Sequence, residues 1–148
     1  MITENIHNAK EELKRADHLL YVSLKYTRTV DVIKSIIHRL INAYDFTFRA
    51  LLEDKKIKKK IGDIPENVGL RVNLIKEYYA TDPIIQDNVE FFLLLRKIDR
   101  AEYTRAREFR RHVTMTAMVE GKPLAVNIDV IVEYFNKVKD FVEYIELK

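Results

Sequence analysis

The sequence predicts a mainly α-helical fold, a bundle of about five helices with a small β-hairpin before the last helix. Apolar residues recur every three or four positions through most of the 148 residues, which is the period of a helix buried on one face. Only three Gly and three Pro interrupt the chain, and only the stretch 112–128 alternates apolar and polar residues as strands do. We expect residues 1–148 to form a single helical domain with its own core.

Two long helices are expected at the start of the chain. The first runs from about Thr3 to Tyr26, and a polar break at Thr27-Arg28-Thr29 follows it. Thr29 is a suitable N-cap for a second helix, from about Val30 to Glu53. Because the connection is short, the two helices are expected to pack antiparallel.

The middle of the chain is predicted to hold two more helices. A basic stretch from Asp54 to Lys60 must be solvated, and Gly62, Pro65 and Gly69 mark irregular structure. A shorter helix then runs from Glu66 or Val68 to Tyr79. Asp82-Pro83 combines an N-cap oxygen with a proline at the first helical position. The helix that starts there is expected to continue to about Arg111, with a bend near 99–104.

A hairpin and a final helix complete the predicted fold. Apolar residues alternate before and after Glu120-Gly121-Lys122-Pro123, so these four residues are expected to form the turn. An isolated hairpin is only marginally stable, and it should therefore lean on the helices or on another subunit. Asn127 or Asp129 is expected to cap the last helix.

The composition excludes several kinds of site. Without Cys there is no disulfide, no thiolate zinc site and no thiol nucleophile. His7 and His18 would lie about 16 Å apart along one helix and cannot share a metal. Neither a G-x-G-x-x-G nor a P-loop motif is present. We therefore expect neither a metal nor a cofactor.

Charge and hydropathy give expectations about location and partners. The 26 basic and 23 acidic residues leave a net charge of +3, too small to indicate nucleic-acid binding by itself. The polar start, Met1 to Asn5, lacks the features of a secretory signal. The longest apolar run, Phe91 to Leu95, is far shorter than the ~18 residues of a membrane span. We expect a cytoplasmic protein with no membrane partner. The apolar run Phe91 to Leu95 also suggests a helix that is buried on more than one side, as in a homodimer.

The strongest functional signal is an arginine-rich segment, 96–112, that ends in a histidine. If the segment is helical, Arg105, Glu108 and His112 lie on one face, and Glu108 can orient the imidazole and raise its pKa. These groups suffice to cleave RNA without a metal. The imidazole would remove the 2′-OH proton, and an arginine would neutralise the charge that builds on phosphorus. Only RNA supplies that hydroxyl.

Arg107-x4-His112 and Arg105-x6-His112, placed late in a helical chain and before its last helix, resemble the motif of the HEPN superfamily. The resemblance implies metal-independent endoribonuclease activity, with the motifs of two protomers meeting in a homodimer. It also implies a nucleotidyltransferase-like antitoxin as a partner. On this interpretation the candidate catalytic residues are His112, Arg105, Arg107 and Glu108.

Other basic residues are candidates for holding an RNA backbone. They are Arg100, Arg110, Arg111, Lys55, Lys56, Lys58, Lys59 and Lys60. Two alternatives remain open. The chain could be a non-enzymatic regulatory domain with a basic binding face, or an oligomerisation domain whose arginines are paired with acids such as Glu102 and Glu108. The arrangement of these side chains in space discriminates between the ribonuclease, the regulatory domain and the oligomerisation domain.

Overall fold

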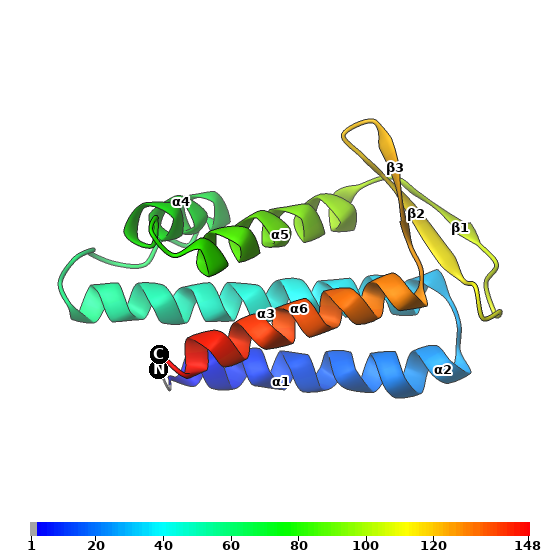
Figure 1. The fold of residues 1–148 in the computed structure, drawn as a ribbon, viewed down its shortest axis with the longest axis horizontal. Helices are drawn as coiled ribbons and strands as arrows, with labels where there is room; N and C mark the ends of the chain where they lie inside the picture. Colours follow the sequence, from blue (N-terminus) through cyan, green and yellow to red (C-terminus); the bar gives the residue numbers. More distant parts are fainter. Residues whose placement is uncertain (1–2) are drawn as a thin grey trace.

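The computed structural model describes residues 3–148 and confirms a mainly α-helical fold (Figure 1). The elements in chain order are α1 (Glu4–His18), the π-helical turn η1 (Leu19–Ser23), α2 (Leu24–Tyr26), α3 (Val30–Ile57), α4 (Val68–Tyr78), α5 (Pro83–Arg100), β1 (Tyr103–Ala106), β2 (Thr114–Val119), β3 (Lys122–Val126) and α6 (Ile128–Glu146). Since α1, η1 and α2 are continuous, the described residues contain five separate helices.

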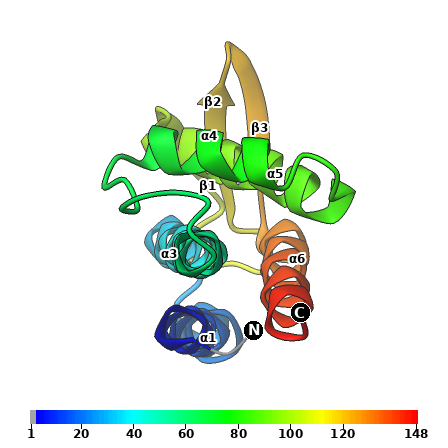
Figure 2. The same ribbon diagram turned by 90° about the vertical axis from the view of Figure 1, so that its left-hand side faces the viewer.

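The long helix α3 lies between α1 on one side and α5 on the other (Figure 1). Figure 2 shows α1, α3 and α6 nearly end-on, with α4 and α5 lying across them. The start of α1 and the end of α6 lie at one end of the bundle, and the sheet lies at the other (Figure 1). The sheet is therefore placed next to the start of α3 and the start of α6.

The core is centred on aromatic rings from three helices. Tyr44 and Phe48 of α3 are stacked, with ring centroids 5.6 Å apart. Phe92 of α5 meets Phe48 edge-on at 5.2 Å, and Phe141 of α6 lies 5.5 Å from Tyr44. The Tyr44 hydroxyl donates a hydrogen bond to the amide oxygen of the buried Asn88 at 2.6 Å. Edge-on and stacked ring pairs add to the hydrophobic gain of burial, so this cluster joins α3, α5 and α6.

Helix starts follow the capping signals of the sequence. The side chains of Thr3, Thr29, Asn67, Asp82 and Asn127 each accept a hydrogen bond from a backbone N–H in the first turn of the helix that follows. The prediction of Thr29 and Asp82 as caps is confirmed, and Asn127 rather than Asp129 caps α6. The second helix is longer than expected, because α3 continues through Lys55 and Lys56 to Ile57.

The sheet is antiparallel in the order β1-β2-β3. The expected four-residue turn is wrong: β3 already begins at Lys122, which pairs with Val119. Glu120 and Gly121 alone form the turn, with φ of 53° and 77°. Two consecutive left-handed residues match the right-handed twist of a hairpin. Val113, Met115, Ala117 and Val126 are fully buried, so the sheet leans on the helices of its own chain.

The expected continuation of the fourth helix to Arg111 is also wrong. Helix α5 ends at Arg100, Ala101 is extended with ψ of 153°, and Tyr103–Ala106 forms β1. Tyr103 pairs with Ala117 and Ala106 with Thr114. Strand pairing and the burial of the adjoining Val113 and Met115 outweigh the helix propensity of this arginine-rich segment.

Asp82 is expected to link the stability of the fold to pH. Burial alone would raise its pKa, but hydrogen bonds from the Ile85 backbone and the Tyr144 hydroxyl, with Lys148 nearby, lower the pKa below 3.8. Its contribution is therefore present above pH 3.8 and is lost as the pH falls through the lowered value. Asp82→Ala should lower the free energy of unfolding near neutral pH by about 1 kcal/mol, measured by urea denaturation.

Asp82→Asn is the matched control, because asparagine still caps a helix but cannot titrate. It should lose less stability than Asp82→Ala. An Asp82→Ala deficit that is as large at pH 3 as at pH 7 would contradict this account.

Candidate nucleic-acid interface

The arginine-rich segment forms an exposed loop between β1 and β2. Arg107 and Phe109 are left-handed, with φ of 55° and 65°. Residues other than glycine rarely adopt this conformation, and it persists only where the surroundings enforce it. The Phe109 side chain is 74% exposed, and Arg107, Arg110, Arg111 and His112 are exposed around it. One aromatic ring therefore stands among four basic side chains.

Backbone contacts hold this loop against the turn before α3. The Phe109 N–H donates to the Arg28 carbonyl at 2.6 Å, and the Val113 N–H donates to the Arg110 carbonyl at 3.1 Å. The side chain of Val113 is fully buried and anchors the end of the loop. The Thr114 hydroxyl donates to the carbonyl of His112 at 2.8 Å. The loop is thus held at its middle and at the end that leads into β2.

Arg105 is occupied by two carboxylates. Its guanidinium donates to Asp31 at 2.9 Å and to Glu108 at 3.0 Å, and it also lies against the Tyr103 ring. The hydrogen bonds to Asp31 and then to Glu108 raise the pKa of Arg105. Glu108 also accepts a hydrogen bond, at 3.4 Å, from the backbone N–H of Val30 at the start of α3. Arg105 and Glu108 therefore act as a clamp between the loop and α3.

The expected helical face of Arg105, Glu108 and His112 does not exist, because these residues lie in β1 and the loop that follows it. The hydrogen bonds of Glu108 go to Arg105 and Val30 rather than to an imidazole. Glu108 is thus placed to hold the loop.

The structure brings His112 into a pocket with other groups. The pocket has a volume of about 270 Å³ and is lined by Arg28, Arg111, His112, Asn127, Ile128 and Asp129. Three separate segments meet there: the turn before α3, the end of the arginine-rich loop and the first turn of α6. Two guanidinium groups and an imidazole therefore share one small space.

The electrostatics of this pocket favour an anion. The first turn of a long helix presents unpaired backbone N–H groups and a partial positive charge. The Nε of Arg28 is buried and has no hydrogen-bond partner among residues 3–148. Asp129 offsets one of the two guanidinium charges, which leaves one positive charge and the helix end in excess. Arginine matches the geometry of phosphate oxygens, so a phosphate group fits this set of donors.

The lysine-rich run lies far from this pocket. Lys55 and Lys56 end α3, and Lys58, Lys59 and Lys60 follow it, whereas the loop contacts the start of the same helix. A helix of 28 residues is about 40 Å long. Several of these lysines have local partners, such as Asp63 for Lys56 and Asp54 for Lys58. Arg100 is exposed at the end of α5, next to the sheet.

Sequence reasoning missed three members of the pocket: Arg28, Asn127 and Asp129. Arg28 sits in a short polar break, and the other two had been considered only as helix caps. No spacing in the sequence links 28 to 112 or 129. Their proximity depends on β1, because that strand turns the arginine-rich loop back toward α3.

Glu108→Ala is expected to loosen the loop. It removes the acceptor for the Val30 N–H and one partner of Arg105, so the free energy of unfolding should fall by about 1 kcal/mol. Amide exchange at Phe109 should accelerate, which hydrogen exchange followed by NMR can measure. The control is Glu102→Ala, a nearby exposed acid. Equal exchange at Phe109 in both variants would contradict the clamp.

Residues 3–148 contain no group of three or more His, Asp or Glu side chains that could hold a metal ion. Within the same residues no helix is both long enough and apolar enough to cross a membrane. No protein-family model, curated protein or solved structure is significantly similar to the chain.

Proposed function

We propose that this protein binds RNA through the loop 107–112, and that the pocket beside the loop takes one backbone phosphate. The observation that carries the proposal is the pocket where Arg28, Arg111 and His112 meet at the first turn of α6. A phosphate there would lie against Arg28 and Arg111, whose guanidinium groups match the geometry of its oxygens. It would also be stabilised by the helix end.

The exposed ring of Phe109 favours a single strand. Bases stack on exposed aromatic side chains when they are not paired, and each stack contributes about 1–3 kcal/mol. Arg107 and Arg110 flank the ring and are exposed. A strand whose base stacks on Phe109 would therefore place neighbouring phosphates against arginines.

The roles expected of Arg105 and Glu108 are reassigned in this proposal. Arg105 already has two acidic partners, and a phosphate would have to displace them. Arg28 and Arg111 are the arginines that line the pocket with His112. Phosphate binding is therefore assigned to Arg28 and Arg111, with Arg107 and Arg110 in support.

RNA cleavage is a second candidate function, favoured by the placement of His112 in the same pocket as two arginines. His112 would accept the 2′-OH proton while the 2′ oxygen attacks the adjacent phosphorus. The bond to the 5′ oxygen breaks, and that oxygen leaves with a proton from water or an acid. The products are a 2′,3′-cyclic phosphate and a 5′-hydroxyl, and no metal takes part. Arg28 or Arg111 would stabilise the charge on the phosphorane.

Arg111→Ala should weaken the binding of a fluorescein-labelled single-stranded RNA about tenfold, because a hydrogen-bonded charge on phosphate is lost. Fluorescence anisotropy at several salt concentrations measures this, and the salt dependence should become shallower. Lys76→Ala, which removes the same charge from α4 at a distance from the loop, is the matched control. Equal affinities for the two variants would contradict the pocket as the phosphate site.

The nuclease candidate is tested by incubating the protein with mixed RNA in chelator, beside His112→Ala. The wild-type protein should release fragments that end in a 2′,3′-cyclic phosphate. The variant should cleave at least about 100-fold more slowly, because the general base is lost, while Arg28 and Arg111 still bind RNA. Cleavage by both proteins, or by neither, would contradict catalysis and leave the binding proposal to its own test.

A further inference from the structure

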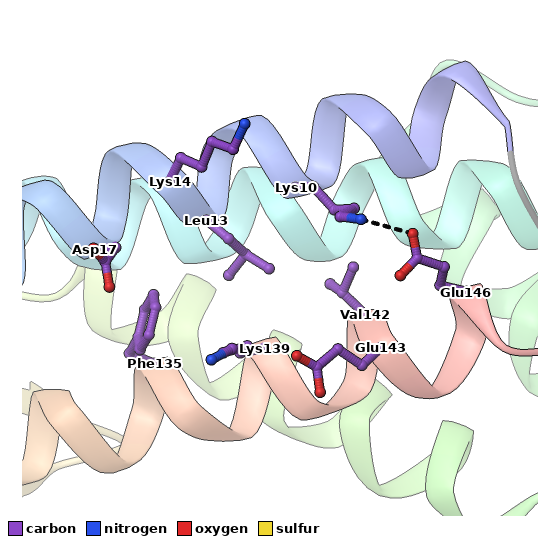
Figure 3. A pocket seen from close by; sticks show the side chains of 9 residues that line it. All are labelled: Lys10, Leu13, Lys14, Asp17, Phe135, Lys139, Val142, Glu143 and Glu146. Carbon is purple, nitrogen blue, oxygen red and sulfur yellow. Dashed lines mark hydrogen bonds and ion pairs between the residues drawn. The ribbon is translucent and has the colours of Figure 1, made fainter.

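A second surface feature lies between α1 and α6. It is separate from the pocket where Arg28, Arg111 and His112 meet, which is called the Arg28 pocket below. The feature is a groove of about 270 Å³ whose floor is formed by Leu13, Phe135 and Val142. Figure 3 shows Leu13 and Val142 pointing toward each other from the two helices, with Phe135 at one end. No residue of this groove belongs to the Arg28 pocket. The two sites can therefore be altered independently.

The two helices run in opposite directions along the groove (Figure 1). Their register is marked by an ion pair between Lys10 of α1 and Glu146 of α6, at 2.9 Å. Charged residues recur along both helices at intervals of three and four, and they line the groove.

The order of charge along the rim is opposite on the two helices. Read from the end of the groove where Phe135 lies, α1 presents an acid, a base and a base, whereas α6 presents a base, an acid and an acid. The residues in this order are Asp17, Lys14 and Lys10 on α1, and Lys139, Glu143 and Glu146 on α6. Each set spans seven positions, or about 10 Å of helix.

Three of these six charged side chains form no ion pair within residues 3–148 of the protomer. They are Asp17, Lys139 and Glu143. Lys14 has only Glu11 of its own helix, at 3.1 Å, and both side chains are exposed. Such exposed pairs contribute little, so Lys14 can exchange its partner at small cost.

We propose that the groove between α1 and α6 is the contact surface for a second copy of this chain. A two-fold axis along the groove places α1 of each copy over α6 of the other. Asp17 then lies over the partner's Lys139, Lys14 over the partner's Glu143, and Lys10 over the partner's Glu146. Every pairing is attractive, and each occurs twice, as a two-fold interface requires.

The apolar part of the surface is small. Leu13, Phe135 and Val142 are largely buried in the protomer. The Tyr21 side chain, which is 52% exposed, extends the surface through an edge-on contact with the Phe135 ring at 6.4 Å. Tyr21 belongs to η1, and single π-helical turns are frequent at functional positions. With little apolar area and many rim charges, the dimer is weak and sensitive to salt.

Charge reversal tests this interface directly. Sedimentation velocity of the wild-type chain over a range of concentrations should show a reversible dimer that dissociates as salt is added. Lys14→Glu and Glu143→Lys should each weaken dimerisation about tenfold or more, because each change acts twice in the dimer and replaces attraction by repulsion. The double variant Lys14→Glu/Glu143→Lys should restore it.

Lys122→Glu on β3 is the matched control and should leave dimerisation unchanged. Circular dichroism of each variant separates a loss of contact from a loss of folding. A wild-type chain that stays monomeric at all concentrations would overturn the proposal and leave the groove to a different occupant. The proposal would also be overturned if Lys14→Glu and Glu143→Lys each dimerised as strongly as the wild-type chain. The same holds if the double variant dimerised as weakly as the single variants. RNA binding by Lys14→Glu tests the Arg28 pocket separately.

Discussion

The rest of the structure depends on the packing of aromatic rings where α3, α5 and α6 meet. Tyr44, Phe48, Phe92 and Phe141 are all fully buried, and the rings of Phe92 and Phe141 each contact both Tyr44 and Phe48. This contact fixes α5 and α6 on α3, and the sheet connects the end of α5 to the start of α6. Both ends of the sheet are therefore anchored by one cluster. The arginine-rich loop takes its place from β1 and β2, so the position of the pocket follows from the core.

The loop itself is held in an unfavourable backbone conformation. Arg107 and Phe109 are left-handed without being glycine, which costs about 1 kcal/mol or more for each residue. The clamp of Glu108 on Val30 and Arg105, the hydrogen bond to Arg28 and the burial of Val113 offset that cost. A loop held in this way would have little conformational entropy left to lose on binding the RNA proposed above. Its arginines and the Phe109 ring are therefore presented in advance, as preorganised binding requires.

Features that depend on neighbouring residues could be predicted from the sequence, whereas a strand that depends on a distant partner could not. The helices, the N-caps at Thr29 and Asp82 and the strands on either side of Glu120-Gly121 follow from side-chain period and capping chemistry, which operate over a few residues. Strand β1 was not predicted. Its four residues alternate weakly and three of them are exposed. Their pairing partners in β2 lie between 8 and 14 positions further along the chain. An arginine-rich stretch also suits a helix, and only contacts with β2 decide against one.

The candidate site was predicted in part, and the error has a definite physical cause. The sequence placed His112 and the arginines in one cluster, but neighbours in the chain were taken for neighbours in space. Once residues 103–106 are extended, Arg105 reaches Asp31, 74 positions away, and becomes part of the scaffold. His112 is instead brought next to Arg28 and the start of α6. The same strand that removes the expected helical face thus creates a pocket from three segments. A pocket that gathers donors from separate elements surrounds an anion on several sides, which a single exposed helical stripe cannot do.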